Sequence, residues 1–339
     1  MTRLALVGCG HWGSNYLRIL QFMEGTEIVS VCDRETAPLE RIRKQYPAVE
    51  IVKDFSSLLE DSKVDAVIIA TPASSHFKLV QQSLEAGKHV LVEKPLALSV
   101  GEASEIVERA QHLKRILMVG HTFLYNPAVQ KMKEYLKKGT LGKIYYLQAI
   151  RTHLGLIRSD VSSVWDLAPH DVSIFSYLLD KVPTKVSAVG GCHLKKDLQD
   201  VAFVSLFYDG NIIGNIHISW VDSNKLRQVA VIGSKARILF DDLNPLERLR
   251  IFEKGVSLDK PYETFGEFQL LLRDGDIISP KVEPEEPLRN VCLDFIRSIQ
   301  TGKKPLTDGK NGLEVVRTMC AIHRSMEQDG APVSVSDVQ

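Results

Sequence analysis

Three glycines near the N-terminus have the spacing that a dinucleotide pyrophosphate needs. Residues 8–13 read Gly-Cys-Gly-His-Trp-Gly, directly after an apolar run and directly before a helix-like segment. In such a turn the first glycine permits the tight bend, the second lets the backbone approach the pyrophosphate, and the third lets helix and strand pack closely. Unpaired amides at the helix N-terminus add donors for the phosphates. The pattern predicts dinucleotide contacts from Gly8, Gly10, His11, Trp12 and Gly13.

An acidic residue ends the second apolar run. Asp33 stands there, at the sequence distance from Gly13 that is typical of dinucleotide-binding folds. A carboxylate at this place accepts both ribose hydroxyls of NAD and repels the 2′-phosphate of NADP, so we expect NAD as the cofactor. Arg34 leaves NADP open, because an arginine beside the acid could hold a 2′-phosphate. A structural turn, with Asp33 capping the next helix, is the alternative.

Two further loops follow apolar runs in this part of the chain. One reads Thr71-Pro72-Ala73-Ser74-Ser75-His76, and the other reads Glu93-Lys94-Pro95. The carboxyl ends of parallel strands meet at one edge of a sheet, where α/β folds bind their ligands. Lys94 is therefore placed for chemistry on a bound substrate. An ordinary surface lysine beside a turn proline is the alternative.

An aspartate and a histidine stand four residues apart in the middle of the chain. Pro169 suits the first turn of a helix, which predicts that His170 lies in that turn and Asp166 in the preceding loop. A helix N-terminus disfavours the imidazolium while a nearby carboxylate favours it, so the imidazole could stay near neutrality and act as a general base. The alternative is that Asp166 only caps the helix and His170 packs against it.

The first third of the chain alternates between apolar runs of strand length and amphipathic helix-like segments. Continuous β-branched runs of this kind suit a parallel sheet covered on both faces. We therefore predict a doubly wound α/β domain over residues 1–121. Its predicted strands are Leu4–Val7, Ile28–Cys32, Glu50–Val52, Ala66–Ala70, Val90–Val92 and Ile116–Val119.

The pattern changes after residue 121. We predict an α+β domain with a largely antiparallel open sheet over residues 122–339, with helices at 127–137, 288–300 and 312–328. Asp209-Gly210 between two apolar runs is a strong hairpin signal. Residues 254–287 read as a loop that could hold one strand. The predicted strands are Lys143–His153, Lys185–Gly190, Val201–Tyr208, Ile212–Trp220, Gln228–Gly233 and Arg237–Phe240.

Composition argues against several classes of protein. The 42 Lys and Arg residues balance the 42 Asp and Glu residues, whereas a nucleic-acid-binding protein would usually show a basic excess. The five cysteines are scattered and form no CxxC pair, and no HExxH spacing occurs, so we expect neither disulfides nor a metal site, and a cytoplasmic location. The first apolar run ends at Gly8, too soon for a signal peptide, and no run is long enough to span a membrane.

Together these motifs resemble the Gfo/Idh/MocA family of NAD(P)-dependent sugar oxidoreductases. The resemblance covers the glycine turn, the Thr71-Pro72 loop with His76, residues 86–95, Tyr125-Asn126-Pro127, residues 139–143, the Asp166/His170 pair and residues 301–309. It implies a Rossmann domain followed by an open-faced sheet domain whose outer face makes a dimer or tetramer. It also implies cofactor contacts from Thr71, Pro72, His76, Glu93 and Lys94.

The resemblance also implies a chemistry and roles for three residues. Hydride would pass between a sugar carbon and the nicotinamide. By position, Lys94 would polarise the reacting oxygen and relay its proton, His170 would be the general base, and Asp166 would orient them or balance their charge.

The chain departs from many family members in two places. Leu124 stands where an arginine is common, and no glycine-rich stretch precedes the Asp166/His170 pair. This version resembles members that oxidise nucleotide-linked sugars, such as UDP-N-acetylglucosamine at C3 or its uronic acid, for surface polysaccharide or lipid A synthesis. Arg151, His153 and Arg158 could meet a diphosphate, and the alternative is that they are ordinary surface charges. The expected substrate contacts are His121, Tyr125, Asn126, Arg151, Arg158, Trp165 and His170.

Three other functions are also compatible with the sequence. They are a dehydrogenase of a free sugar or polyol such as glucose or inositol, a glycosidase that uses bound NAD transiently, and a redox sensor that binds NAD without turnover. Retention of Lys94, Asp166 and His170 speaks against the sensor. Net NADH production separates a dehydrogenase from a glycosidase.

Overall fold

The computed structural model describes residues 1–155, 157–158, 160–256 and 272–338. They form two compact units: unit 1 has residues 1–125 with 285–317, and unit 2 has residues 126–284 with 318–338. The sequence predicts a single boundary after residue 121, but the segment 285–317 belongs to unit 1. The reason is that α9 (Pro287–Thr301) packs against α1 (His11–Leu20) and against the 3-10 turn η2 (Thr122–Tyr125).

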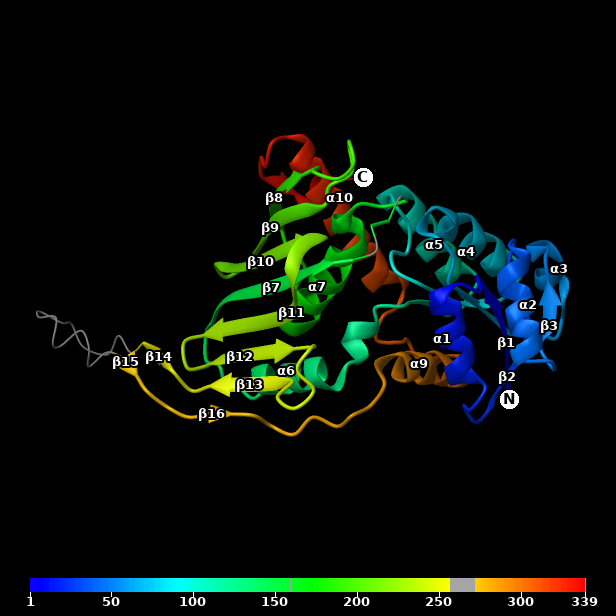
Figure 1. Ribbon diagram of the computed structural model, residues 1–339, viewed down its shortest axis with the longest axis horizontal. Coiled ribbons are helices and arrows are strands. Elements are labelled where there is room, and N and C mark those ends of the chain that lie inside the picture. The colour runs from blue at the N-terminus through cyan, green and yellow to red at the C-terminus, as the bar shows by residue number, and fades with distance from the viewer. Residues whose placement is uncertain (156, 159, 257–271, 339) are drawn as a thin grey trace, which may run out of the picture. The chain divides into compact units, whose positions relative to one another are not determined.

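Unit 1 is built on a six-stranded parallel sheet with the order β3-β2-β1-β4-β5-β6, of which β1, β2 and β3 are labelled in Figure 1. All four residues of β4 are buried, as expected for a sheet covered on both faces. The strand order reverses between β1 and β4, which is where doubly wound sheets bind ligands. The strands are β1 (Thr2–Val7), β2 (Thr26–Cys32), β3 (Glu50–Val52), β4 (Ala66–Ile69), β5 (His89–Val92) and β6 (Leu117–Val119).

Two connecting helices of unit 1, α3 (Phe55–Glu60) and α5 (Val100–His112), begin at capping signals that are visible in the sequence. The Asp54 side chain accepts the N–H of Ser56 at 3.2 Å, and the Ser99 hydroxyl accepts the N–H of Glu102 at 3.2 Å. Helices α2 (Thr36–Gln45) and α4 (His76–Glu85) also connect strands of this sheet, with a 3-10 turn η1 (Ala73–Ser75) before α4. The predicted doubly wound α/β domain is confirmed.

Unit 2 contains a nine-stranded sheet with the order β16-β13-β12-β11-β7-β10-β9-β8-β17 (Figure 1). Its pairs are antiparallel except for β7 with β10, so the predicted largely antiparallel sheet is confirmed. The strands are β7 (Ile144–Leu154), β8 (Lys185–Gly191), β9 (Val201–Tyr208), β10 (Ile212–Ser219), β11 (Val221–Gly233), β12 (Arg237–Asp241), β13 (Leu249–Phe252), β16 (Ile277–Ile278) and β17 (Val333–Ser334).

One face of this sheet is covered by helix α7 (Ser163–Leu179), which contacts β7, β9 and β10. Gly214 lets the helix approach, because a Cβ there would lie 2.8 Å from the Phe175 ring. On β10 the side chains of Ile216 and Ile218 are buried while Ile213 is exposed, because successive residues of a strand point to opposite faces of the sheet. The Asp209-Gly210 turn joins β9 to β10, and Gly210 adopts a φ of +87°.

Some elements differ from the sequence prediction. Strand β13 is not predicted, β11 begins at Val221 rather than Gln228, and residues 254–287 include β14 (Gly255–Val256) and β15 (Leu272–Arg273) besides β16. Residues 257–271 of that predicted loop lie outside the described residues. The remaining helices are α6 (Pro127–Lys137), α10 (Gly309–Glu327) and the 3-10 turn η3 (Val335–Asp337). No helix in the described ranges is long and apolar enough to cross a membrane.

Candidate active site

Two glycines of the first turn are required by the protein itself. Gly8 has a φ of +92°, and a Cβ there would lie 2.6 Å from the carbonyl oxygen of Ala70. A Cβ on Gly13 would overlap the carbonyl oxygen of Gly8. The sharp turn between β1 and α1, and the close packing of that helix on the sheet, therefore depend on these two positions.

Gly10 is different, because nothing in the protein requires a glycine there. It is the exposed N-cap of α1, its φ is −71°, and no protein atom lies within 4 Å of a Cβ built on it. The open space in front of the first turn of α1 fits a pyrophosphate, which needs close backbone approach and free amide donors. His11 and Trp12 are exposed beside Gly10, so no protein atoms prevent their predicted contacts with the cofactor.

Asp33 is anchored beside this turn by two backbone amides. Its Oδ2 accepts the N–H of Cys9 at 2.6 Å, and its Oδ1 accepts the N–H of Glu35 at 2.9 Å. An ionised carboxylate has about four lone-pair sites, so two remain for ribose hydroxyls. Asp33 is not the cap of α2, because that helix has Glu35 as its N-cap. Arg34 is exposed.

The thiol of Cys9 takes no part in this chemistry. Burial raises the pKa of Cys9 to about 12, and the charge of Asp33 adds to the effect. The side chain is fully buried between the two turn glycines. Its place therefore reflects the need for a small residue.

Lys94 follows β5 and is half-buried, and the Lys94–Pro95 peptide bond is cis. The preceding Glu93 points inward, is 6% exposed, and accepts the Tyr16 hydroxyl at 2.8 Å. Burial raises the pKa of Glu93, while the Tyr16 hydrogen bond opposes the rise. Gly120 leaves room for this carboxyl group, since a Cβ there would lie 3.0 Å from Glu93 Oε1. The Glu93 side chain is thus engaged with Tyr16, and its contact with the cofactor remains a prediction.

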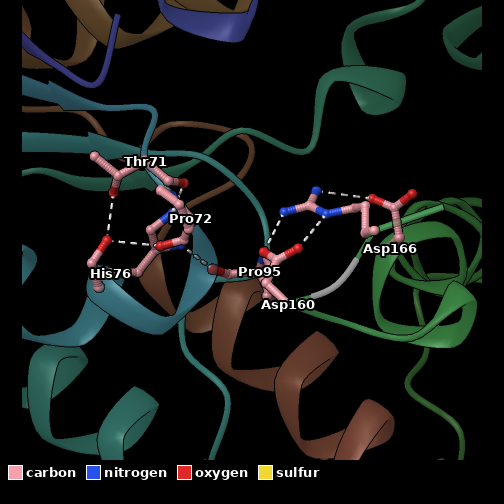
Figure 2. Close-up of polar contacts among 8 residues, drawn as sticks. Thr71, Pro72, His76, Pro95, Asp160 and Asp166 are labelled. Carbon is pink, nitrogen blue, oxygen red and sulfur yellow. Dashed lines mark hydrogen bonds and ion pairs between the residues drawn. The ribbon is translucent and has the colours of Figure 1, made fainter. Parts of the chain in front are cut away.

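Residues of the loop that follows β4 are drawn in Figure 2. Pro72 is exposed and Thr71 is half-buried, so both can face a bound cofactor. His76 is 1% exposed, and its two ring nitrogens lie within hydrogen-bonding distance of the carbonyl oxygens of Thr71 and Pro95 (Figure 2). The expected direct contact of His76 with the cofactor is therefore not supported, because the ring is enclosed by backbone.

His121 is buried near Lys94 and is held by Asn311, a residue that no local sequence pattern marks. Its Nδ1 lies 2.8 Å from Asn311 Oδ1. Burial lowers the pKa of His121 to about 4, the hydrogen bond to Asn311 opposes the shift, and the charge of Lys94 lowers the pKa further. The imidazole is therefore neutral at physiological pH. The sequence separation of 190 residues leaves no local signal for this pair.

Tyr125 and Asn126 have structural tasks. The buried Tyr125 hydroxyl donates to Asp294 Oδ2 at 2.6 Å, and the buried Asn126 side chain caps α6 by accepting the N–H of Ala128 at 2.9 Å. Burial also raises the pKa of Tyr125, and the carboxylate of Asp294 adds to it. These contacts do not support the prediction that the two residues bind substrate.

In unit 2, helix α7 begins earlier than predicted. Ser162 is its N-cap and accepts the N–H of Trp165 at 3.5 Å, so Asp166 lies in the first turn, Pro169 lies inside the helix, and His170 follows one turn beyond Asp166. The two side chains share a helix face because they are four residues apart. The expected effect of the helix N-terminus on His170 is wrong, since it fades beyond the first turn. His170 and Trp165 are half-buried.

Arg158 lies against Asp166. Its guanidinium donates to Asp160 at 2.9 and 2.6 Å and to Asp166 Oδ1 at 3.3 Å, and Figure 2 shows these two carboxylates. The hydrogen bond to Asp160 raises the pKa of Arg158. One third of the Arg158 side chain is exposed, so the cation can also meet an anion from solvent.

Arg151, unlike Arg158, is buried in an ion pair. It is 4% exposed and donates to both carboxylate oxygens of Asp171, at 3.0 and 2.8 Å. This buried bidentate pair joins β7 to α7, and removing either partner would leave the other charge buried without a counter-charge. The prediction that Arg151 meets a diphosphate is therefore not supported. His153, on the same strand, is half-buried, and burial lowers its pKa.

Each unit thus gathers its own set of functional groups. Unit 1 brings the glycine turn, Asp33, the Thr71-Pro72 loop and Lys94 to the carboxyl ends of its strands. Unit 2 brings Arg158 to Asp166, with His170 on the same helix face. Within the described residues no group of three or more His, Cys, Asp or Glu side chains could hold a metal ion.

Family models match both units. A model described as an oxidoreductase family with an NAD-binding Rossmann fold matches residues 2–121. A second, the GFO/IDH/MocA C-terminal domain, matches residues 129–239. The two matches together cover more than half of the chain.

Named relatives align over nearly the whole chain. Myo-inositol 2-dehydrogenase from Thermotoga maritima is 24% identical over 342 residues, which cover 96% of this chain and 96% of the relative. UDP-N-acetylglucosamine 3-dehydrogenase from Acidithiobacillus ferrooxidans is 25% identical over 331 residues, which cover 96% of this chain and 97% of the relative. A solved structure from gentamicin A biosynthesis, in complex with NAD, has a TM-score of 0.83 at 22% identity, covers 98% of this chain and 96% of its own, and shows the shared fold.

Proposed function

Because the chain belongs to the GFO/IDH/MocA family of NAD-binding oxidoreductases, we propose that it oxidises a ring hydroxyl of a nucleotide-linked sugar. The proposed substrate is UDP-N-acetylglucosamine or its uronic acid, oxidised at C3, and the product would serve surface polysaccharide or lipid A synthesis. Similarity to a UDP-N-acetylglucosamine 3-dehydrogenase supports this choice.

The observation that carries the substrate class is Arg158. It is a partly exposed cation directly beside Asp166, on the segment that leads into α7. Its ion pairs are partly exposed and are worth about 0–1 kcal/mol each, so a diphosphate can replace Asp160 at little cost. A free polyol has no anionic group to form an ion pair with this cation.

The proposed chemistry divides between the two units. NAD, when bound, supplies the hydride acceptor. Lys94 polarises the reacting oxygen, His170 takes the proton of the hydroxyl and passes it to water, and Asp166 balances the charge of the resulting imidazolium. The overall change is alcohol plus NAD⁺ to ketone, NADH and a proton. The anchored Asp33 carboxylate supports NAD rather than NADP, because it repels a 2′-phosphate.

A second candidate is a dehydrogenase of a free polyol such as inositol. One observation favours it: Arg151 is buried against Asp171, which leaves Arg158 without the second arginine expected for a diphosphate. The similarity to a myo-inositol 2-dehydrogenase points the same way.

A substrate panel separates the two candidates. Purified protein with NAD is offered UDP-N-acetylglucosamine, its uronic acid, inositol and glucose, and NADH formation is followed. The reaction releases a proton, so each pH unit upward favours oxidation by about 1.36 kcal/mol, and the assay runs at raised pH. We expect NADH with a UDP-sugar. Efficient turnover of inositol or glucose with both UDP-sugars inert would establish the second candidate, and consumption of substrate without net NADH would indicate a glycosidase.

We also propose a homodimer or homotetramer formed through the outer face of the unit 2 sheet. Neighbouring strands place exposed apolar side chains in register there: Tyr146 pairs with Ile213, and Val189 pairs with Phe203, each 43–51% exposed. A second copy of this chain is the occupant that would bury such a row on both sides.

The five cysteines are free thiols, which supports a reducing cytoplasmic location.

Light scattering after size-exclusion chromatography tests the assembly. Phe203→Asp should reduce the measured mass to that of a monomer, because a carboxylate would be buried without a partner. Val182→Asp is the matched control, since Val182 is 42% exposed but lies outside the sheet. A wild-type mass for Phe203→Asp would contradict the proposed interface.

A further inference from the structure

His76 lies at the first residue of α4, enclosed by backbone. Its Nδ1 is 2.7 Å from the carbonyl oxygen of Pro95, and its Nε2 is 2.9 Å from the carbonyl oxygen of Thr71 (Figure 2). The ring is 1% exposed, so water does not solvate these nitrogens freely. The proposed reaction gives this ring no task.

The two carbonyl oxygens favour the charged form of the ring. A carbonyl oxygen only accepts hydrogen bonds, and a neutral imidazole has one N–H donor and one acceptor nitrogen. In a neutral ring one nitrogen lone pair would therefore face a carbonyl oxygen at hydrogen-bonding distance. An imidazolium donates from both nitrogens and makes two charge-assisted hydrogen bonds.

Two effects oppose the charge. Burial and the N-terminus of α4 both disfavour an imidazolium. The loop at 70–75 has no titratable side chain, α4 carries Lys78 and Glu85, and Glu93 and Lys94 precede Pro95. Helix α5, which packs against α4, carries Glu102, Glu105, Glu108, Arg109 and His112. Against the two opposing effects stand two short contacts that only the charged ring satisfies.

The ring also connects two loops that leave neighbouring strands. Residues 70–75 follow β4, Lys94 and Pro95 follow β5, and β4 pairs with β5. Thr71 and Ser75 share a hydrogen bond of 2.7 Å, and the Ser75 hydroxyl donates to the Pro72 carbonyl at 2.7 Å, so the first loop is internally braced. A bond from this braced loop to Pro95 restrains the backbone directly after Lys94.

We propose that His76 is a positioning residue, held as a buried imidazolium that fixes the Lys94–Pro95 turn to the loop after β4. Its contribution passes through Lys94, so this part rests on the proposed role of Lys94 in the reaction.

The protonation state can be measured without any assay of activity. The protein is labelled with ¹⁵N at histidine, and the His76 ring signals are assigned by their loss in His76→Gln. At about pH 8, where an ordinary histidine with a pKa of about 6.5 is neutral, both His76 ring nitrogens should carry protons. A His76 signal from an unprotonated ring nitrogen would overturn the imidazolium.

Kinetics test the positioning role. Loss of an aligned group through a small displacement costs up to about 100-fold in rate, so His76→Gln should lower kcat by about 10- to 100-fold while the Kd for NAD and the KM change less than about threefold. Lys78→Ala, on the exposed side of the same helix, is the control and should behave as wild type. Unchanged kcat in His76→Gln would refute the role, and thermal melting of both variants shows whether the fold is intact.

A double mutant separates this inference from the proposed function. If His76 acts through Lys94, adding His76→Gln to Lys94→Ala should cause no further loss of kcat. A further loss of the full single-mutant size would contradict the coupling. Wild-type kcat in Lys94→Ala alone would instead refute the proposed role of Lys94, and the ¹⁵N result would stand independently.

Discussion

Gly10→Ala is the sharpest test of where the cofactor binds, because the structure separates the needs of the protein from those of the ligand. A Cβ at Gly10 meets no protein atom within 4 Å, and its φ of −71° suits any residue. The change replaces one N-cap residue by a poorer one, which costs about 1 kcal/mol or less. At about 2–4 °C per kcal/mol, the melting temperature without NAD should fall by only a few degrees.

The same methyl group would occupy the space proposed for the pyrophosphate. We therefore expect the Kd for NAD to rise at least about tenfold, which corresponds to about 1.4 kcal/mol. Titration calorimetry with NAD measures the affinity, and thermal melting with and without NAD measures the stability. The stabilisation by NAD should shrink in parallel.

Gly13→Ala is the matched comparison. Its Cβ would overlap the carbonyl oxygen of Gly8, so the backbone must move, and overpacking of this kind costs about 3 kcal/mol or more. The NAD-free protein should then melt about 10 °C lower. Wild-type affinity for NAD in Gly10→Ala would show that the pyrophosphate does not approach this turn and would refute the reasoning.

Four further predictions follow from single residues. Asp33→Ala should narrow the preference for NAD over NADP in fluorescence titrations, and equal wild-type affinities would contradict the role of the carboxylate. Lys94→Ala and His170→Ala should each lower kcat by about 100-fold or more in steady-state assays, as expected for loss of a positioned acid or base, and the Kd for NAD should change little in His170→Ala. Arg158→Ala should raise the KM for a UDP-sugar without changing the Kd for NAD, and an unchanged KM would make Arg158 an ordinary surface charge. The pKa of His121 is about 4 in the folded protein, below the value of about 6.5 for an unfolded chain. The neutral ring therefore contributes fully to the free energy of unfolding above pH 6.5, and this contribution of at most about 3 kcal/mol is lost as the pH falls toward 4. Denaturation curves of His121→Gln measured across this pH range should not show that loss of stability.

The parallel sheet of unit 1 could be predicted nearly strand for strand. Each strand is a continuous apolar run because both of its faces are buried, and a local run of residues reveals this. The turn at Gly8 is also predicted from a local pattern of glycines, although its steric limit comes from Ala70, in the loop after the adjoining strand β4. Strand β13 gives a weaker sequence signal, because it is short and its alternate residues are only half-buried.

The start of α7 shows how one residue type can mislead. Pro169 suits a first helical turn, but Ser162 caps the helix earlier, and the proline is accommodated inside it as a buried residue. The error moved His170 into the first turn and gave the helix N-terminus an influence that it does not have. A proline permits more than one place in a helix, and the competing cap decides between them.

The amino-acid sequence alone determined the class of the protein, its cofactor and the residues proposed for the chemistry. These depend on local patterns: a glycine turn between a strand and a helix, an acid at the end of the next strand, and a lysine at the edge of a parallel sheet. Only the tertiary structure decided which of the charged and polar side chains are free. Arg151 donates hydrogen bonds to Asp171, Glu93 accepts one from Tyr16, and the His76 ring contacts two backbone carbonyl groups. Each partner lies on a different segment of the chain, and local periodicity does not encode which segments meet.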